Sequence, residues 1–356
     1  MKILVYLEKS AVRGGIEVFA ERHVARLRAE GHEVDVSNGF SRKERKGRKD
    51  GAVLCDLCVL CGEKEIPIDD FDEIIVHKCS DVATLEKFPP EKTVYYVHDH
   101  EPICPRGYAY TPLKRNCTCA GGVWPCLFCA PACRSWKAAL GRVFSQSRRI
   151  AAMSRFKKIV VISEFMKWRL VANDVPAEKI VVEPPKISRA EARNRPLRVG
   201  VTHGEATKPS EARAERRREV DLLYVGQLIR GKGVHLLLEA MAKMKSHRTL
   251  DIVGTGNMEG ELKALAERLG LKGRVRFNGF QDSPQEWMRR AACVVVPSFW
   301  QEPYGLVAAE AVALGRPVVA FAIGGLPEAC QGKATLVPPG DIDALAKALE
   351  KEQLDE

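Results

Sequence analysis

Two carboxylates, Glu302 and Glu310, are separated by seven residues and form the strongest candidate for chemistry in this sequence. An apolar run at 293–298 precedes them and predicts a buried parallel strand. A helix of small residues follows and ends near Leu314. Because Pro303 disfavours helical backbone at the residue before it, we expect Glu302 in the loop and Glu310 inside the helix.

This spacing predicts a ligand that is elongated and anionic. The helix axis advances about 9 Å from Tyr304 to Glu310, so the two acids address separate points. The free backbone N–H groups of the helix start, at Gly305 and Leu306, suit a phosphate. An acid, an anion cradle and a second acid together describe a nucleotide-sugar. The alternative is two solvated glutamates on a surface helix.

The sequence around these acids resembles a known family. It reads Ser298-Phe-Trp-Gln-Glu-Pro-Tyr-Gly, then Ala308-Ala-Glu-Ala-Val-Ala-Leu-Gly-Arg-Pro-Val-Val-Ala, then Gly324-Gly-Leu-Pro-Glu. This order closely resembles the donor-site signature of family-four retaining glycosyltransferases, the glycosyl transferases of group 1. The resemblance implies the α/β fold called GT-B, with two Rossmann-like domains facing each other across a cleft. It also implies transfer of a sugar from a nucleotide diphosphate with retention at the anomeric carbon.

Length and pattern predict how the chain is divided. With 356 residues it is long enough for two domains. We expect an acceptor-side domain at 1–185 with a Cys-rich insertion at 104–133, a polar linker at 186–219, and a nucleotide-sugar domain at 220–356. No stretch reaches eighteen apolar residues and a strand begins at Lys2, which favours a soluble cytoplasmic protein.

Charge points to an anionic partner without selecting one. The formal net charge of +10 is compatible with a nucleotide, a lipid headgroup, a polyanionic glycan or nucleic acid. The basic segment Ser135–Lys158 is either a helix packed on the sheet through its apolar stripe or a helix lying on an anionic membrane at the inner face. Given the resemblance, we expect a glycan or lipid-linked acceptor rather than nucleic acid.

Candidate residues of the first half lie at two strand ends. Gly14 and Gly15 follow the first strand and open a helix, where a Gly-Gly turn allows close approach to a ligand. The run Thr93–Val97 delivers His98 and Asp99 at its carboxyl end, where sites form in open parallel sheets. In the resembled family the Gly-Gly turn closes over the donor diphosphate and the His-Asp pair faces the reacting sugar.

The second half begins with a strand that leads into a basic glycine turn. This turn runs from Gly226 to Gly233 and brings Arg230 and Lys232 to a helix start. In the resembled family an arginine and a lysine here hold the diphosphate; Lys232 matches the lysine, but Gln227 occupies the arginine position, and we expect Arg230 to substitute for it. Gly254 opens a further turn, and the resemblance places Phe280 against the base.

The resemblance assigns a role to each of these groups. Glu302 holds sugar hydroxyls, Glu310 holds the ribose hydroxyls and His98 orients the reacting sugar. Lys232 and Arg230 stabilise the departing phosphate, which needs no catalytic divalent metal. The donor is a UDP-, GDP- or ADP-sugar, and no side chain is assigned as a nucleophile.

Cysteines are concentrated in the first half of the chain. Of the twelve, the group spanning the predicted insertion has the ligand density of a structural zinc site, and an iron–sulfur cluster is the alternative. Its members are Cys104, Cys117, Cys119, Cys126, Cys129 and Cys133. A second group, Cys55, Cys58, Cys61 and Cys79, reads either as metal ligands or as part of a buried strand.

Two alternatives to a glycosyltransferase remain at this point. A phosphorylase or a sugar-nucleotide epimerase shares the expected fold, although the sequence shows no context for the lysine-bound pyridoxal of a phosphorylase. A cysteine-metal module that senses redox state or binds nucleic acid, with a vestigial sugar-nucleotide site, is the alternative from a different class.

Overall fold

The computed structural model describes residues 1–8, 15–37, 68–104, 117, 136–187 and 220–351. These residues fall into two compact units, one ending at Pro184 and the other holding residues 220–351. The predicted boundaries at 185 and 220 stay a prediction, because the intervening residues 188–219 lie outside the described ranges.

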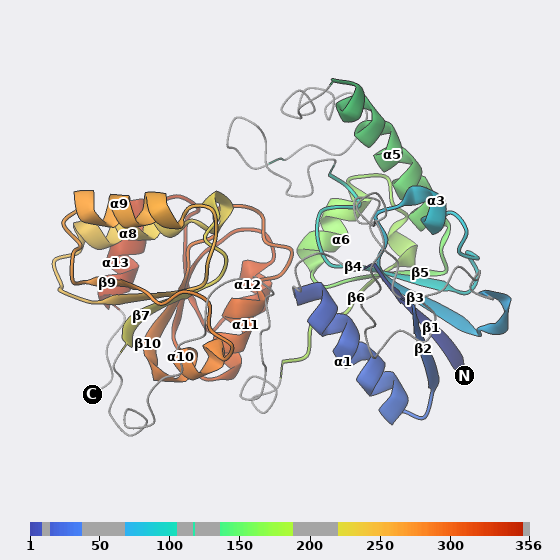
Figure 1. The fold of residues 1–356 in the computed structure, drawn as a ribbon, viewed down its shortest axis with the longest axis horizontal. Helices are drawn as coiled ribbons and strands as arrows, with labels where there is room; N and C mark the ends of the chain where they lie inside the picture. The colour runs from blue at the N-terminus through green and yellow to red at the C-terminus, as the bar shows by residue number, and fades with distance from the viewer. Residues whose placement is uncertain (9–14, 38–67, 105–116, 118–135, 188–219, 352–356) are drawn as a thin grey trace, which may run out of the picture. The chain divides into compact units, whose positions relative to one another are not determined.

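The first unit is built on a six-stranded parallel sheet in the order β2-β1-β3-β4-β5-β6 (Figure 1). Its strands are β1 (Lys2–Leu7), β2 (Glu33–Ser37), β3 (Glu73–Lys78), β4 (Thr93–Val97), β5 (Lys158–Val161) and β6 (Ile180–Val182). Every residue of β4 is buried, as the continuous apolar pattern of a central parallel strand requires.

Helices of the first unit connect these strands. They are α1 (Gly15–Ala29), α3 (Val82–Leu85), α5 (Trp136–Arg155) and α6 (Glu164–Val171), with short 3-10 turns at Ile68–Asp70 and Ala177–Lys179. Helix α6 begins directly after Ser163. The Ser163 hydroxyl oxygen accepts a hydrogen bond from the Met166 amide at 3.1 Å and caps α6.

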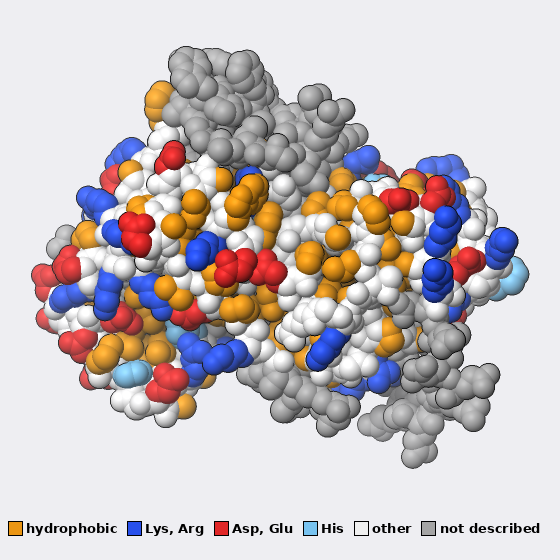
Figure 2. Space-filling model, turned by 180° about the vertical axis from the view of Figure 1, so that it is seen from behind, with side chains coloured by type: hydrophobic (Ala, Val, Ile, Leu, Met, Phe, Trp, Pro, Cys, Tyr) orange, Lys and Arg blue, Asp and Glu red, His pale blue; other side chains and the backbone are white. Residues whose placement is uncertain are grey.

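Helix α5 is the basic segment for which packing and membrane contact were both open. Its Met153 and the following Phe156 are buried, so one side packs within the unit. Phe144 is 58% exposed, and Arg148 pairs with Glu86 on the outer side. On the face of the molecule seen in Figure 2, basic and acidic side chains are interspersed and do not form one basic surface. None of the described helices is long and apolar enough to cross a membrane.

The second unit repeats the architecture with the sheet order β12-β11-β10-β7-β8-β9, again parallel throughout. Its strands are β7 (Val220–Val225), β8 (Leu250–Val253), β9 (Val275–Phe277), β10 (Ala291–Val296), β11 (Val318–Phe321) and β12 (Thr335–Val337). Its helices are α8 (Val234–Lys243), α9 (Glu259–Arg268), α10 (Pro284–Arg290), α11 (Leu306–Ala313), α12 (Leu326–Cys330) and α13 (Ile342–Lys351), with a 3-10 turn η5 at Arg230–Lys232.

The helices of the second unit form two layers, one on each face of the sheet. Figure 1 shows α8, α9 and α13 on one face, and α10, α11 and α12 on the other. The predicted α/β fold of two Rossmann-like units is therefore confirmed for each unit. The cleft expected between them stays a prediction.

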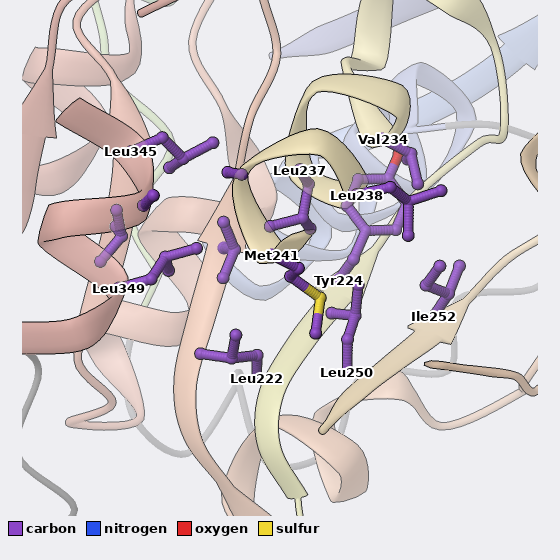
Figure 3. Packing of buried hydrophobic residues seen from close by; sticks show 14 of the residues in the cluster. Leu222, Tyr224, Val234, Leu237, Leu238, Met241, Leu250, Ile252, Leu345 and Leu349 are labelled. Carbon is purple, nitrogen blue, oxygen red and sulfur yellow. The ribbon is translucent and has the colours of Figure 1, made fainter. Parts of the chain in front are cut away.

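One apolar cluster joins the second sheet to helices α8 and α13. Figure 3 shows Leu237, Leu238 and Met241 of α8 directed at strand residues such as Leu222, with Leu345 of α13 beside them. All five side chains are fully buried. This packing fixes the start of α8 relative to the sheet, and thereby holds the basic turn that precedes it.

We predict that Leu237→Ala lowers the free energy of unfolding by about 2 to 5 kcal/mol, because it leaves a cavity against the sheet. Denaturant unfolding followed by circular dichroism measures the change. Leu336→Ala is the matched control, since Leu336 on β12 is 38% exposed and its loss should cost less than about 1 kcal/mol. Equal losses for the two variants would contradict this assignment of the core.

Candidate functional site

The basic turn at 226–233 and the segment that carries Glu302 and Glu310 lie at one place in the sheet of the second unit. Strands β7 and β10 are neighbours, and the chain progresses outward from them in opposite directions. Ligands of open parallel sheets bind beyond the carboxyl ends of the strands at such a reversal. The loop after β7 carries Lys232, and the loop after β10 carries Glu302.

Lys232 and Glu302 form a buried ion pair at the centre of this site. The Lys232 ammonium lies 2.6 Å from Glu302 Oε1, and the Ser298 hydroxyl donates to the same oxygen at 2.7 Å. The Glu302 side chain is 9% exposed and that of Lys232 24% exposed. Both residues were predicted to belong to the site, but no feature of the sequence predicted that they pair or that Ser298 contributes.

The surroundings of Glu302 keep it ionised despite its burial. Burial raises the pKa of this carboxyl group, but the charge of Lys232 and the hydrogen bonds from Lys232, Trp300 and Ser298 outweigh that effect. The net pKa lies below the usual value of a glutamate. The site therefore holds a fixed negative charge next to a fixed positive one.

Trp300 is a further residue of the site. It belongs to the motif that begins at Ser298, but the motif alone gave it no role. The Lys232 ammonium lies 5.0 Å from the centroid of its ring, within the range of a cation–π contact. A β-carbon on Gly231 would approach this ring to 3.1 Å. The Phe299 amide also donates to the Gly231 carbonyl at 3.1 Å. The two loops thus pack closely enough to hold Lys232 over the indole.

Gly233 allows this approach of the loops. Its φ of +73° is left-handed, and a β-carbon there would lie 1.8 Å from the Pro297 carbonyl oxygen. Only glycine fits both conditions. The residue caps the start of α8 and so ties that helix to the end of β10.

Helix α11 starts at the position predicted for an anion cradle. Gly305 has a φ of +113°, no side chain caps the N-terminus of the helix, and Leu306 is its first residue. A β-carbon on Gly305 would lie 2.4 Å from the Leu326 side chain, so this glycine lets α11 and α12 approach each other.

Glu310 lies inside α11, as Pro303 led us to expect. It is 1% exposed, and its Oε2 accepts a hydrogen bond from the Gln285 amide of α10 at 3.2 Å. Gln285 is equally buried, and no sequence motif pointed to it. The assignment of Glu310 to ribose stays a prediction.

Gly226 and Gly254 have a packing role that the sequence did not reveal. A β-carbon on Gly254, whose φ is +138°, would lie 1.8 Å from the Gly226 carbonyl oxygen. The Gly254 amide donates to the carbonyl of Gly279 at 2.7 Å, immediately before Phe280. These contacts bring the ends of β7, β8 and β9 together, and Phe280 is half-buried beside them.

Arg230 is exposed in η5, two residues before Lys232. Within the part of the chain that the structure describes, it has no acidic partner. The nearby His235 lies edge-on to Phe299, with ring centroids 5.5 Å apart. Burial and then the charge of Arg230 lower the pKa of His235 to about 4, so this ring is neutral.

In the first unit, His98 lies directly after β4 as predicted. Its Nε2 is 2.9 Å from Nδ1 of His77 on β3, and Nε2 of His77 is 3.1 Å from Nδ1 of His23 on α1. No feature of the sequence predicted that these three residues are in contact. Gly15 begins α1, while Gly14 lies outside the described residues.

Most of the predicted metal ligands fall outside the described ranges. These are Cys119, Cys126, Cys129 and Cys133. Of the remaining two, Cys104 lies in the segment that follows β4. Cys117 is described although its neighbours in the sequence are not, and its carbonyl oxygen accepts a hydrogen bond from Arg169 at 3.2 Å. Across the described residues no group of three or more metal-ligating side chains is present. The zinc or iron–sulfur site therefore stays a prediction, and so does the ligand role of Cys55, Cys58 and Cys61.

Cys79 from the second cysteine group can be placed. It is buried at the end of β3, and its thiol donates to the Asp81 carbonyl at 3.3 Å. Burial and then the charge of Glu8 raise the pKa of this thiol to about 12, so it is protonated. In this structure Cys79 is a small buried side chain and not part of a metal site among the described residues.

Comparison with known proteins concerns mainly the second unit. Residues 219–352 match the family of glycosyl transferases group 1. An uncharacterized glycosyltransferase of Methanocaldococcus jannaschii is 36% identical over 136 residues, which are 36% of this chain and 35% of that protein. The glycogen synthase of Mycobacterium tuberculosis is 38% identical over 148 residues, 40% of this chain and 36% of that protein. The chain thus covers about a third of the length of each relative.

The segment that carries Lys232, Glu302 and Glu310 lies wholly inside the family match. Residues 219–352 belong to the group 1 glycosyltransferases. The recognition made from the sequence motifs is confirmed by this match.

The likeness of the fold extends beyond the group 1 glycosyltransferase segment. The crystal structure of HepE from Anabaena in complex with UDP-glucose superposes with a TM-score of 0.62 at 20% identity. The superposition covers 98% of this chain and 89% of HepE. The two Rossmann-like units of this chain therefore have the GT-B fold.

The ion pair of the group 1 domain should make stability depend on pH. In Lys232→Met, we predict that Glu302 is left charged and buried, which lowers the free energy of unfolding at pH 7 by about 2 kcal/mol. The loss should shrink as pH falls, because protonation of Glu302 removes the uncompensated charge. In the parent, the depressed pKa works in the opposite sense, and its stabilisation disappears as pH falls below the usual glutamate range.

Unfolding titrations at several pH values between about 3 and 7 measure both slopes. The matched control is the double variant Lys232→Met with Glu302→Gln, which should recover most of the loss at pH 7 because no charge remains. A pH-independent loss in Lys232→Met would contradict the coupling.

The crowding at Gly233 makes a separate prediction. Gly233→Ala should cost several kcal/mol, because it combines a left-handed backbone with a clash against the Pro297 carbonyl. Gly315→Ala is the matched control, with a φ of +71° and open space around it, and should cost about 1 kcal/mol. Thermal unfolding of the two variants separates crowding from backbone conformation.

Proposed function

We propose that the protein is a retaining glycosyltransferase that moves a sugar from a nucleotide diphosphate to a glycan, lipid or small-molecule acceptor. The observation that carries this proposal is the Lys232–Glu302 pair at the reversal point of the second sheet. The family match of residues 219–352 and the UDP-glucose complex of HepE support it.

The chemistry requires negative charge to build on the departing diphosphate while positive charge builds on the sugar. Lys232 and the exposed Arg230 supply cations for the diphosphate, and the uncapped N-terminus of α11 at Gly305 supplies free backbone N–H groups. The turn that carries Lys232 is held in place before the reaction by packing against the loop after β10. No divalent metal is needed for this step.

Glu302 serves the other end of the donor in this proposal. Its Oε1 accepts from Lys232 and Ser298, and we assign the other carboxylate oxygen, Oε2, to the sugar hydroxyls. Binding of the diphosphate draws on the same ammonium that pairs with Glu302. The donor therefore enters a site whose opposite charges match its hydroxyl-bearing and phosphate-bearing ends.

Glu310 is assigned to the ribose and His98 to the reacting sugar. Because Glu310 is 1% exposed and bonded to Gln285, it reaches a ribose hydroxyl only if that hydroxyl enters between α10 and α11. We assign no nucleophile, and the departing phosphate takes the proton of the acceptor. A role in the synthesis of cell-surface polysaccharide or glycoconjugate, at the cytoplasmic side of a membrane, is part of this proposal.

A donor panel tests the proposal. UDP-, GDP- and ADP-glucose are each added at about 100 times the dissociation constant, where a true donor should stabilise the protein by about 2.7 kcal/mol. Slow release of the nucleotide from the same donor reports turnover. Glu302→Ala and Lys232→Ala should each lower that rate by about a hundredfold or more, as loss of one electrostatic contact to a transition state does.

Arg289→Ala serves as the control, because Arg289 is an exposed residue of α10. This variant should release nucleotide at the parent rate. Unchanged rates in both Glu302→Ala and Lys232→Ala would overturn the assignment of the site. A panel in which neither sugar-nucleotide nor nucleotide binds would overturn the proposed function itself.

A further inference from the structure

The first unit contains a feature that the proposed roles do not use: three histidines joined in series by their ring nitrogens. His98 Nε2 and His77 Nδ1 are 2.9 Å apart, and His77 Nε2 and His23 Nδ1 are 3.1 Å apart. His77 and His23 are 2% and 6% exposed. Both nitrogens of the central ring are therefore committed to the other two histidines.

Aromatic neighbours hold the three rings in place. Phe19 of α1 lies edge-on to His98 and His77, with centroids 4.9 Å and 5.7 Å away. Tyr96 of β4 lies 4.7 Å from His77 and 5.0 Å from His23. These contacts come from α1, β3 and β4, so the series is part of the packed unit and not a chance surface contact.

The surroundings keep all three rings neutral near pH 7. Burial and then the charge of His23 lower the pKa of His98 to about 3. Burial lowers the pKa of His77 well below its usual value. Burial and then Arg26 lower the pKa of His23 to about 4, although Glu183 acts in the opposite direction.

A neutral series of this kind has two proton arrangements that keep both hydrogen bonds. A neutral imidazole carries one N–H, so if His77 donates from Nδ1 to His98, its Nε2 must accept from Nδ1 of His23. All three rings then carry their proton on Nδ1. If His77 instead donates from Nε2 to His23, all three carry it on Nε2. Any mixed neutral arrangement breaks at least one of the two bonds.

The consequence falls on the remaining nitrogen of His98. Its Nδ1 has no hydrogen-bond partner among the residues that the structure describes. In the first arrangement this nitrogen is a donor, and in the second it is an acceptor. Its role is therefore coupled to the far end of the series, at Nε2 of His23.

We propose that His77 and His23 are positioning residues that couple the tautomer of His98 to their own. Its Nδ1 can thereby be either the donor or the acceptor toward a hydroxyl of the bound sugar. The sugar as ligand rests on the proposed function; the coupling of the three rings does not. When Nδ1 of His98 gives up its proton to a water molecule, the proton on His77 Nδ1 passes to His98 Nε2. The proton on His23 Nδ1 passes to His77 Nε2, and His23 takes one from water at Nε2. Every ring stays neutral, and one proton leaves as another enters.

Nitrogen-15 NMR of protein labelled at histidine tests the coupling, because the ring-nitrogen shifts distinguish the two neutral tautomers. In the parent we expect all three rings to be neutral at pH 7 and to share one tautomer ratio. His23→Leu removes one hydrogen bond and should change the ratio at His98, although His98 does not bond to His23 directly. His23→Gln keeps a donor and an acceptor and should restore part of the parent ratio.

His32→Gln is the matched control, because His32 follows α1 outside the series and should leave His98 unchanged. An unchanged ratio at His98 in a folded His23→Leu protein, or different tautomers on the three rings of the parent, would overturn the inference.

Kinetics with the glucose donor that the parent turns over provide the second measurement. His23→Leu should lower kcat by about threefold to tenfold with KM unchanged, the factor expected from one hydrogen bond, and His23→Gln should recover part of it. A parent that turns over no sugar-nucleotide overturns the proposed function and the role of the sugar. Uncoupled tautomers in an active parent overturn only the positioning roles of His77 and His23.

Discussion

A carboxylate that is almost completely removed from water is the constraint on which the second unit depends. Glu302 is stable there only because a lysine from another loop and a serine four residues earlier neutralise and solvate it. That requirement ties the loop after β7 to the loop after β10. Since these loops leave neighbouring strands at the reversal of the sheet, the ion pair also marks where a ligand can be bound.

The two units hold their candidate site residues in place by different interactions. Each places candidate site residues beyond the carboxyl ends of a parallel sheet, Lys232 and Glu302 in the second unit and His98 in the first. In the second unit the site is ordered by opposite charges, at Lys232 and Glu302. In the first unit it is ordered by neutral rings, because His98, His77 and His23 exclude charge through burial. A polar, phosphate-bearing donor suits the former, and a sugar hydroxyl suits the latter.

Sequence was sufficient for what depends on local pattern. Apolar runs predicted the strands at Thr93–Val97 and before Glu302, and Pro303 predicted that Glu302 lies in the loop and Glu310 in the helix. The motifs from Ser298 onward were specific enough to indicate the family. These signals are short-range, because each depends only on the residues of one helix or strand and of the turn beside it.

What the sequence could not supply were contacts between distant segments. Nothing near His98 identifies His77 or His23 as its neighbours, since they are 21 and 75 positions away, on β3 and α1. Gln285 has no motif and meets Glu310 only because α10 packs beside α11. The turn at Gly254 is equally uninformative about packing, because only the folded chain brings the Gly226 carbonyl against it. Such roles exist only once the chain has folded.

The tight fit at Gly233 has a consequence for how donor preference can be altered. With the Pro297 carbonyl in the space of its missing side chain, the basic turn cannot shift relative to the strand end beside it. Substitutions at this buried contact would destabilise the fold before they changed which ligand is preferred. If the proposed function holds, substitutions meant to change the preference for a sugar-nucleotide are better placed at the exposed Gln227.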